Sequence, residues 1–153
     1  MGNIFHDDFR EFIQALNNQQ VDYILVGGYS VILYGYARNT GDMDIWVNPT
    51  KENYNRLVKS FQEFKMPVFD MTEDNFLHNN SLDVFTFGRP PVCIDIMKEV
   101  KGLRFDQAYQ HSGIVETEGF PIRLVDYRDL IKAKKASARA KDLNDIENLS
   151  DKE

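Results

Sequence analysis

The chain has 153 residues, a length typical of one domain, and 42% of them are hydrophobic, which is enough to build a core. Its formal net charge of -6 argues against broad binding to the nucleic-acid backbone, which requires a basic surface. The single cysteine, Cys93, excludes an intrachain disulfide and a cysteine-based zinc cluster. We expect one domain over residues 1–150, followed by a short tail over residues 151–153.

The N-terminal segment MGNIFHDDFREF is polar and acidic and lacks the apolar centre of a signal peptide. No apolar run approaches the ~18 residues that a membrane-spanning helix needs. We therefore expect a cytoplasmic protein that does not act in a membrane.

The first half of the chain alternates between helical and strand patterns. Apolar residues recur at helical spacing near the N-terminus, and the short apolar run VDYILVGG is typical of a buried strand that ends on glycines. Thr50 is positioned to cap the helix that follows it. In chain order, the predicted elements are a helix over 4–16, a strand over 21–28, a buried helix over 29–36, a strand over 42–47 and a helix that runs to residue 64.

The second half of the chain predicts strands and then a helix. Two segments alternate like strands around a Gly-Arg-Pro-Pro connection, and Glu118-Gly119 marks the turn of a hairpin. Asp126 can cap the last helix. The predicted elements are strands over 81–88 and 92–100, a helix over 105–112, a hairpin over 113–125 and one helix over 127–143. This order indicates an α+β fold in which helices pack against a central mixed β-sheet.

Asp42 and Asp44 stand one residue apart in a segment that otherwise resembles a buried strand. Alternate residues of a strand face the same side, so both carboxylates would lie on one face, with Met43 and Ile45 on the other. Two carboxylates so close repel each other, and a divalent cation such as Mg²⁺ removes that repulsion. The alternative is that Asp42 closes a turn and Asp44 pairs with a lysine.

A second ion requires a third carboxylate, for which Asp95 is the natural candidate. It lies between two isoleucines in a predicted strand, where an acidic side chain has no structural reason to be, and Asp83 is the weaker rival. Two ions held in this way stabilise both the attacking and the leaving oxygen of a phosphoryl-type displacement. The candidate catalytic and metal-binding residues are therefore Asp42, Asp44 and Asp95.

Gly27 and Gly28 mark the turn from a predicted strand to a predicted helix. Glycine lets the backbone approach a ligand closely, and the N–H groups at the start of a helix attract anions. Ser30 would add a hydroxyl donor. The pattern is neither a Walker loop nor a dinucleotide-binding fingerprint, and taken alone it favours a tight strand-to-helix turn.

Together, these motifs resemble the polymerase-β-like nucleotidyltransferase superfamily. The pattern consists of Gly27-Gly28, a gap of 13 residues, Asp42-Met43-Asp44 and a later strand with Asp95. The stretch YILVGGYSVILYGYARNTGDMDIWV resembles the small bacterial members, which are minimal nucleotidyltransferases and relatives of abortive-infection toxins. The tail LVDYRDLIKAKKASARAKDLNDIENL resembles their closing helix. The resemblance covers about residues 21–149 and implies the nucleotidyltransferase fold, with the site on the exposed edge of the sheet.

The resemblance also implies a reaction. Asp42 and Asp44 would hold two Mg²⁺ ions, and Asp95 would hold the catalytic ion and act as general base. A nucleoside monophosphate would pass from an NTP, with ATP favoured, to an acceptor hydroxyl on a protein, RNA or small molecule, and pyrophosphate would leave. Two alternatives stay open: a weakly catalytic or non-catalytic toxin–antitoxin partner of the same fold, and an antibiotic-adenylylating enzyme. The acceptor could be bound by a partner protein or by a second copy in a homodimer.

The resemblance assigns the triphosphate to Gly27, Gly28 and Ser30. The superfamily often has Gly-Ser at this motif, whereas here Gly28 takes the place of the serine and Ser30 lies two positions later. Six basic residues and one acid lie between Arg128 and Lys141, after which acids dominate. The candidate nucleotide-binding residues are therefore Gly27, Gly28, Ser30, Arg38, Lys134 and Arg139, although a solvated helix surface is the usual meaning of such a charge run.

Overall fold

The computed structural model describes residues 5–89 and 91–150, so the predicted tail over 151–153 lies outside the described residues. Six strands form one mixed sheet, whose strand order is β3-β4-β2-β1-β6-β5. The β1–β6 and β2–β4 pairs are parallel, and the other neighbours are antiparallel. The strands are β1 (Tyr23–Val26), β2 (Asp42–Val47), β3 (Val84–Arg89), β4 (Val92–Met97), β5 (Gly113–Thr117) and β6 (Phe120–Leu124).

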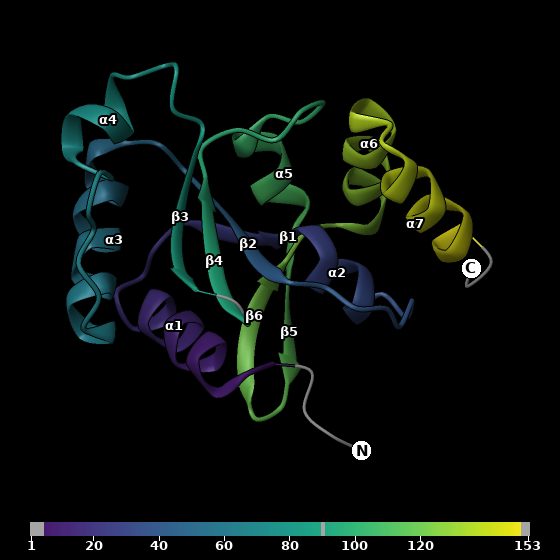
Figure 1. Ribbon diagram of the computed structural model, residues 1–153, viewed down its shortest axis with the longest axis horizontal. Coiled ribbons are helices and arrows are strands. Elements are labelled where there is room, and N and C mark those ends of the chain that lie inside the picture. Colours follow the sequence, from purple (N-terminus) through teal and green to yellow (C-terminus); the bar gives the residue numbers. More distant parts are fainter. Residues whose placement is uncertain (1–4, 90, 151–153) are drawn as a thin grey trace.

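Helices cover both faces of this sheet, which confirms the expected α+β fold (Figure 1). No described helix is long and apolar enough to cross a membrane. The helices are α1 (Asp7–Asn18), α2 (Gly27–Leu33), α3 (Lys51–Phe64), α4 (Glu73–Leu77), α5 (Phe105–His111), α6 (Tyr127–Ser137) and α7 (Ala140–Ser150).

Alternating side chains of the strands build two separate cores, one on each face of the sheet. On one face, Met43 and Ile45 of β2 pack with Phe12 of α1 and Phe61 of α3. All four side chains are fully buried. In Figure 1, α1 and α3 lie together on the left of the sheet. Burial of each such large apolar side chain contributes about 1.5–3 kcal/mol, so this core fixes which face of β2 points outward.

The second core lies on the opposite face. Trp46 of β2 packs there with Val31 of α2, Leu130 of α6 and Leu149 of α7. This core lies toward the C-terminal end of β2, whereas Asp42 and Asp44 occupy the N-terminal part of the same strand face. The two aspartates therefore lie outside this apolar core.

Two predicted caps are confirmed, and the boundaries of the first helix are corrected. The side chain of Thr50 accepts a hydrogen bond from the N–H of Asn53, and Asp126 accepts one from Arg128. Helix α1 begins at Asp7 rather than at residue 4, which lies outside the described residues, and His6 caps it. The short helix α4 was not predicted, because its five residues are too few to show a helical period.

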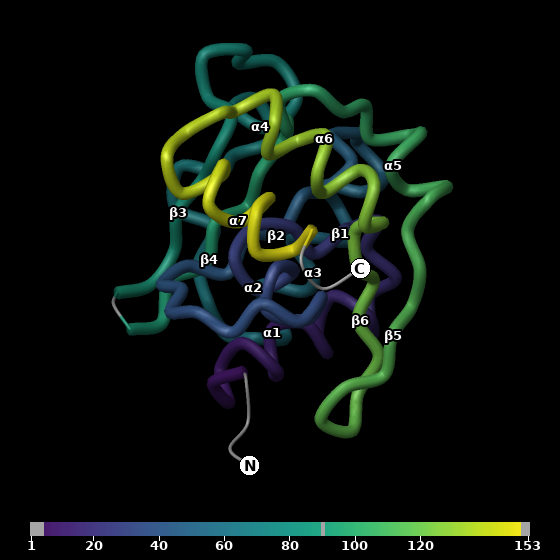
Figure 2. Tube along the Cα trace, turned by 90° about the vertical axis from the view of Figure 1, so that its right-hand side faces the viewer, coloured from purple at the N-terminus to yellow at the C-terminus, as the bar shows by residue number. Residues whose placement is uncertain are grey.

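The prediction of one continuous helix over 127–143 is wrong. Helix α6 ends at Ser137, Ala138 adopts a left-handed conformation with φ of 51°, and α7 begins at Ala140. The side chain of Asp142 accepts a hydrogen bond from the backbone N–H of Arg139, which stabilises the new helix start. Figure 2 shows the resulting pair in yellow, with the chain turning between α6 and α7.

Candidate active site

Asp44 of β2 and Asp95 of β4 are direct neighbours across the parallel strand pair. Asp42 lies two residues before Asp44 on the same face, opposite Cys93. The prediction that both β2 aspartates face away from the buried Met43 is confirmed, because Met43 belongs to the core on the other side of the sheet. Strand pairing thus brings Asp95 next to two carboxylates that precede it by about fifty residues in the sequence.

Burial and the neighbouring Asp95 raise the pKa of two of these carboxyl groups, Asp42 and Asp44. Burial, the charge of Asp95 and a hydrogen bond with Asp95 together raise the pKa of Asp44 to about 7. Burial and a hydrogen bond with Asp95 likewise raise the pKa of Asp42. Lys141 partly offsets both shifts. Two carboxylates can share a hydrogen bond only when one of them carries a proton, so part of the negative charge of the site is neutralised in this way.

Thr86 of β3 is a member of the site that the sequence interpretation missed. It pairs with Asp95 in the antiparallel β3–β4 register, and its Oγ1 donates a hydrogen bond of 2.7 Å to Asp95 Oδ1. The sequence could have indicated Thr86, because alternate residues of a strand face opposite sides. Phe85 and Phe87 are buried in the core, so Thr86 between them faces the other side of the sheet, as Asp95 does. Thr86 therefore orients the third carboxylate.

Gly27 and Gly28 meet the site in two different ways. Gly27 has φ of +71°, and a Cβ at this position would overlap the carboxylate of Asp44. A Cβ at Gly28 would overlap the side chain of Thr40, next to the guanidinium of Arg38. Both glycines are therefore required by close approach, as expected for a backbone segment that borders a ligand site.

Ser30 does not reach the surface in this structure. It is fully buried in α2, and its Oγ donates a hydrogen bond of 2.6 Å to the carbonyl oxygen of Gly27. The predicted contact between this hydroxyl and a triphosphate is therefore not available in this conformation. The short hydrogen bond instead stabilises the backbone of the glycine turn.

Arg139 lies in the break between α6 and α7 and is held by Asp142. Its Nε and Nη2 donate hydrogen bonds of 2.7 and 3.2 Å to the Asp142 carboxylate. Burial alone would raise the pKa of Asp142, but the hydrogen bonds from Arg139 and the charge of Lys134 outweigh it, and the pKa is lowered. Asp142 therefore stays ionised next to two cations.

Arg38 and Lys134, the other two candidate cations, meet at Asp145 of α7. Arg38 Nε lies 2.8 Å from Asp145 Oδ1, and Lys134 Nζ lies 3.0 Å from Asp145 Oδ2. Lys134 Nζ also lies 3.3 Å from Asp142. Asp145 is fully buried, so these ion pairs join the loop before β2 to both C-terminal helices.

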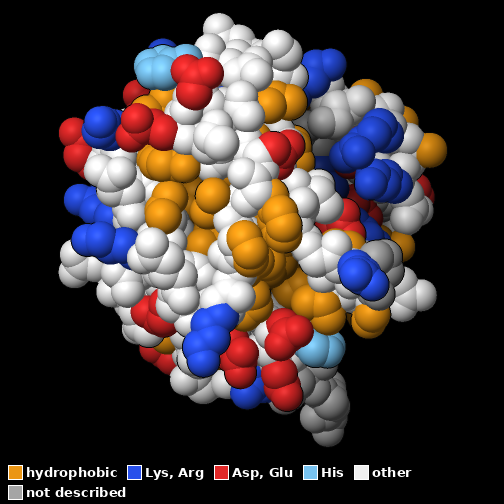
Figure 3. Space-filling model, turned by 60° about the vertical axis from the view of Figure 1, so that its left-hand side comes forward, with side chains coloured by type: hydrophobic (Ala, Val, Ile, Leu, Met, Phe, Trp, Pro, Cys, Tyr) orange, Lys and Arg blue, Asp and Glu red, His pale blue; other side chains and the backbone are white. Residues whose placement is uncertain are grey.

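A polar cavity of about 480 Å³ brings the candidate residues together. Every predicted site residue except Ser30 lines it, and so do Thr40 and Lys141, which were not predicted. Although Lys134 and Lys141 lie on separate helices, both reach this cavity. Figure 3 shows the surrounding surface, where Lys and Arg side chains gather at the right of the view around a recess that holds acidic side chains.

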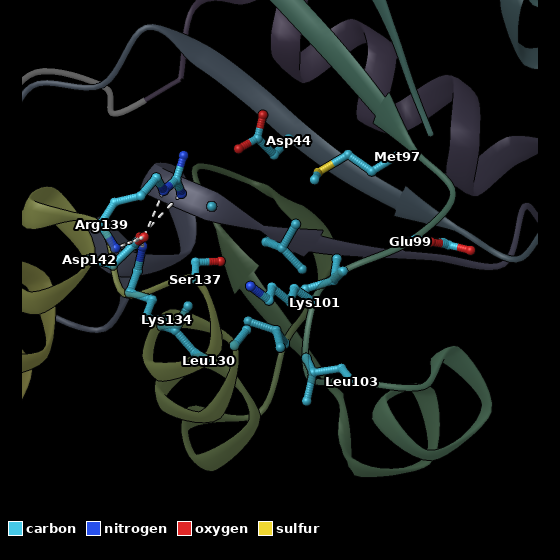
Figure 4. Close-up of a pocket in the computed structure, with 15 residues that line it drawn as sticks. Asp44, Met97, Glu99, Lys101, Leu103, Leu130, Lys134, Ser137, Arg139 and Asp142 are labelled. Carbon is cyan, nitrogen blue, oxygen red and sulfur yellow. Dashed lines mark hydrogen bonds and ion pairs between the residues drawn. The ribbon is translucent and has the colours of Figure 1, made fainter. Parts of the chain in front are cut away.

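A second cavity, of about 420 Å³, adjoins the first and is mainly apolar. The two cavities share Gly27, Asp44, Met97, Lys134 and Arg139. In Figure 4, Asp44 and Arg139 lie at one end of the apolar cavity, and Glu99 and Leu103 lie at the other. The carboxylates and the basic side chains therefore meet where a polar chamber joins an apolar one.

Residues 7–150 match the family described as "Nucleotidyltransferase of unknown function (DUF6036)". The chain belongs to this family. The match covers nearly the whole chain and confirms the resemblance on which the sequence interpretation rested. No curated protein matches this nucleotidyltransferase.

Two solved structures share the fold of the nucleotidyltransferase at 17% sequence identity. A Thermotoga maritima protein assigned as a nucleotidyltransferase has a TM-score of 0.61, over 95% of this chain and 91% of that chain. The lincosamide antibiotic adenylyltransferase LnuA, solved with lincomycin, has a TM-score of 0.58, over 99% of this chain and 100% of that chain. Identity at this level bears on the fold, which is the nucleotidyltransferase fold expected from the sequence.

The chemistry of the three aspartates fits a hard divalent cation. Mg²⁺ prefers carboxylate oxygens, and burial together with the neighbouring Asp95 raises the pKa of both Asp42 and Asp44. Over residues 5–89 and 91–150, no three carboxylate, histidine or cysteine side chains already converge as metal ligands. Mg²⁺ binds ionised carboxylates, so metal binding at neutral pH requires Asp44, whose pKa is raised to about 7, to give up its proton.

Proposed function

We propose that this nucleotidyltransferase is Mg²⁺-dependent and transfers a nucleoside monophosphate from an NTP, with ATP favoured, to an acceptor hydroxyl. The observation that carries the proposal is the pairing of Asp44 with Asp95 beside Asp42, in a cavity that glycines and four basic side chains also line. Such a cavity offers carboxylates for metal ions and cations for a polyphosphate. The reaction forms a bond between the acceptor oxygen and the α-phosphorus and breaks the bond to pyrophosphate.

Each part of the chain has a separate task in this proposal. Asp42, Asp44 and Asp95 would hold Mg²⁺, which supplies charge neutralisation for the attacking and leaving oxygens. Asp95 takes the proton of the acceptor hydroxyl, and Thr86 keeps that carboxylate oriented. The backbone at Gly27 leaves room for phosphate oxygens next to Asp44, since no Cβ occupies that space.

The experiment that tests the proposal is label transfer. The protein is incubated in cell lysate with Mg²⁺ and, in turn, ATP, CTP, GTP or UTP labelled at the α-phosphate. We expect label from one nucleotide in a protein, RNA or small-molecule fraction, which also identifies the acceptor class. Label on a small cationic drug that is added to a parallel incubation would favour an antibiotic adenylyltransferase, the activity that the name of LnuA gives for that protein.

The Asp44→Asn variant should lose label transfer by a factor of 100 or more while remaining folded, because removal of a metal-binding charge acts on the transition state. Asp83→Asn is the matched control, since this exposed carboxylate lies outside the polar cavity and should leave transfer unchanged. Full transfer by Asp44→Asn would contradict the metal role. No transfer by the wild type with any of the four nucleotides would favour a non-catalytic partner of the same fold.

A further inference from the structure

Three of the four basic side chains that line the polar cavity are held by two carboxylates of one helix. Asp142 and Asp145 lie one turn apart on α7, and together they bind Arg38, Lys134 and Arg139. We propose that this acidic pair consists of positioning residues, which hold the three cations at the polar cavity so that they bind the pyrophosphate portion of an NTP. The inference rests on the proposed function and adds two residues to the site.

Asp142 holds Arg139, the more exposed of the two side chains. The side chain of Asp142 is only 1% exposed, whereas that of Arg139 is 60% exposed. Asp142 accepts hydrogen bonds from the backbone N–H, Nε and Nη2 of Arg139. In Figure 4, the guanidinium extends from the α6–α7 break toward the strand that carries Asp44. The buried acid therefore fixes the direction of an accessible cation, and Nη1 is not occupied by Asp142.

Asp145 forms ion pairs with Arg38 and Lys134, which come from two other parts of the chain. Arg38 Nη2 donates a hydrogen bond of 3.0 Å to Asp145 Oδ2. A Cβ at Gly28 would lie 3.3 Å from this same nitrogen. Asp145 thus keeps Arg38, from the loop before β2, beside the glycine turn.

Packing alone does not account for this arrangement. A buried carboxylate needs a cationic partner, and any cation could satisfy that need. Here all three partners also line the same cavity, which places them near the three aspartates of the sheet. Cations that are oriented before the ligand arrives cost less entropy to use, so the acidic pair would increase affinity for an anion although it carries negative charge.

Lys141 provides an internal comparison. It lines the polar cavity and is exposed, and it forms no ion pair with any residue in the described ranges. A flexible lysine of this kind acts as a point charge. Its replacement should weaken phosphate binding independently of Asp142 and Asp145.

The test measures binding of Mg²⁺-pyrophosphate by calorimetry in the full-length protein. Asp142→Asn should weaken binding about tenfold, because Arg139 loses its charged partner and its fixed direction. The decisive measurement is a double-mutant cycle. If Asp142 acts through Arg139, the double variant Asp142→Asn/Arg139→Ala should bind pyrophosphate as weakly as Arg139→Ala alone. Glu147→Gln, which removes an exposed carboxylate of the same helix, should bind like the wild type.

A cycle on Asp145→Asn and Arg38→Ala repeats the test on the other half of the acidic pair, in case Asp142→Asn fails to fold as judged by its melting temperature. Additive losses of pyrophosphate affinity in a folded double variant would overturn the inference. So would an acidic-pair variant that binds pyrophosphate as tightly as the wild type or more tightly. In either case, label transfer by the wild type would still uphold the proposed function. If the wild type neither binds Mg²⁺-pyrophosphate nor transfers label, both fail together.

Discussion

At the scale of single residues, Gly27 links the two motifs of the site. In the antiparallel β1–β2 pair, Val26 lies opposite Asp44, so the residue after Val26 turns across the Asp44 carboxylate. A side chain at Gly27 would occupy the position of that carboxylate. The glycine motif and the Asp-x-Asp motif are thus constrained by one steric contact, although 16 residues separate Gly27 from Asp44.

Gly27→Ala should therefore damage both stability and chemistry. A left-handed conformation costs a residue with a Cβ about 1–2 kcal/mol, and the methyl group must in addition displace Asp44. We expect the melting temperature to fall by several degrees and label transfer to fall at least tenfold. Gly41→Ala borders the same cavity but has open space for a Cβ, so it should change neither quantity much. An active and fully stable Gly27→Ala protein would show that Asp44 does not require this contact.

At the scale of elements, the sequence predicted those features that depend on local periodicity. The alternation of DMDIWV placed Asp42 and Asp44 on one face, and the two helix caps at Thr50 and Asp126 lie as predicted. The pairing of β2 with β4 is a contact between strands that are not consecutive, so local pattern alone could not show that Asp44 meets Asp95. Asp95 was a candidate because an acid is unexpected between two isoleucines of a strand, and the family resemblance supported that choice.

The basic helix shows where a local pattern misleads. The acids after Lys141 were interpreted only as a reversal of charge, because an ion pair across a helix break leaves no periodic signal. The break itself occurs at Ala138, a residue type that favours helices, and depends on hydrogen bonds from Arg139 to Asp142. The sequence therefore identified Lys134 and Arg139 as candidates but not the carboxylates that hold them.

The left-handed Ala138 predicts a stabilising substitution. Ala138→Gly removes the steric cost of a positive φ. Glycine loses more entropy on folding than alanine does, but the steric gain is larger, so the net stabilisation should be about 0.5–1 kcal/mol. In a domain of this size, the melting temperature should rise by about 1–4 °C. Ala133→Gly is the matched control, since it lies within α6 and should lower stability by about 1 kcal/mol. A lower melting temperature for Ala138→Gly would mean that α6 and α7 are continuous in solution.

At the scale of the whole molecule, the site places mutually repelling carboxylates in a fold whose sheet is otherwise well packed between helices. Two apolar cores hold the sheet between helices, and Asp42 and Asp44 lie on a part of β2 that belongs to neither core. Their proximity is imposed by strand register, which the cores fix, and so the fold tolerates the repulsion rather than relieving it. Stability of the metal-free protein should consequently depend on how many protons these carboxylates hold.

The direction of that dependence follows from the pKa of Asp44. The carboxyl has a pKa of about 7 in the folded protein and 3.8 as the reference value for the unfolded chain, so between these values the folded state binds the extra proton. Stability should therefore fall as pH rises from about 4 to about 7, and then level off. The raised pKa of Asp42 acts in the same direction, whereas the lowered pKa of Asp142 affects stability only below about pH 4.

Melting temperatures in EDTA should thus be higher at pH 5.5 than at pH 8, by about 3 °C or more, since each pKa unit corresponds to about 1.4 kcal/mol. Mg²⁺ binds only the ionised carboxylates, so it should raise the melting temperature more at pH 8 than at pH 5.5. In Asp44→Asn, which cannot lose the proton, both the pH dependence and the Mg²⁺ effect should shrink. Equal pH dependence in the wild type and in this variant would place the titrating group elsewhere in the fold. Equal stabilisation of both proteins by Mg²⁺ would likewise place the cation away from Asp44.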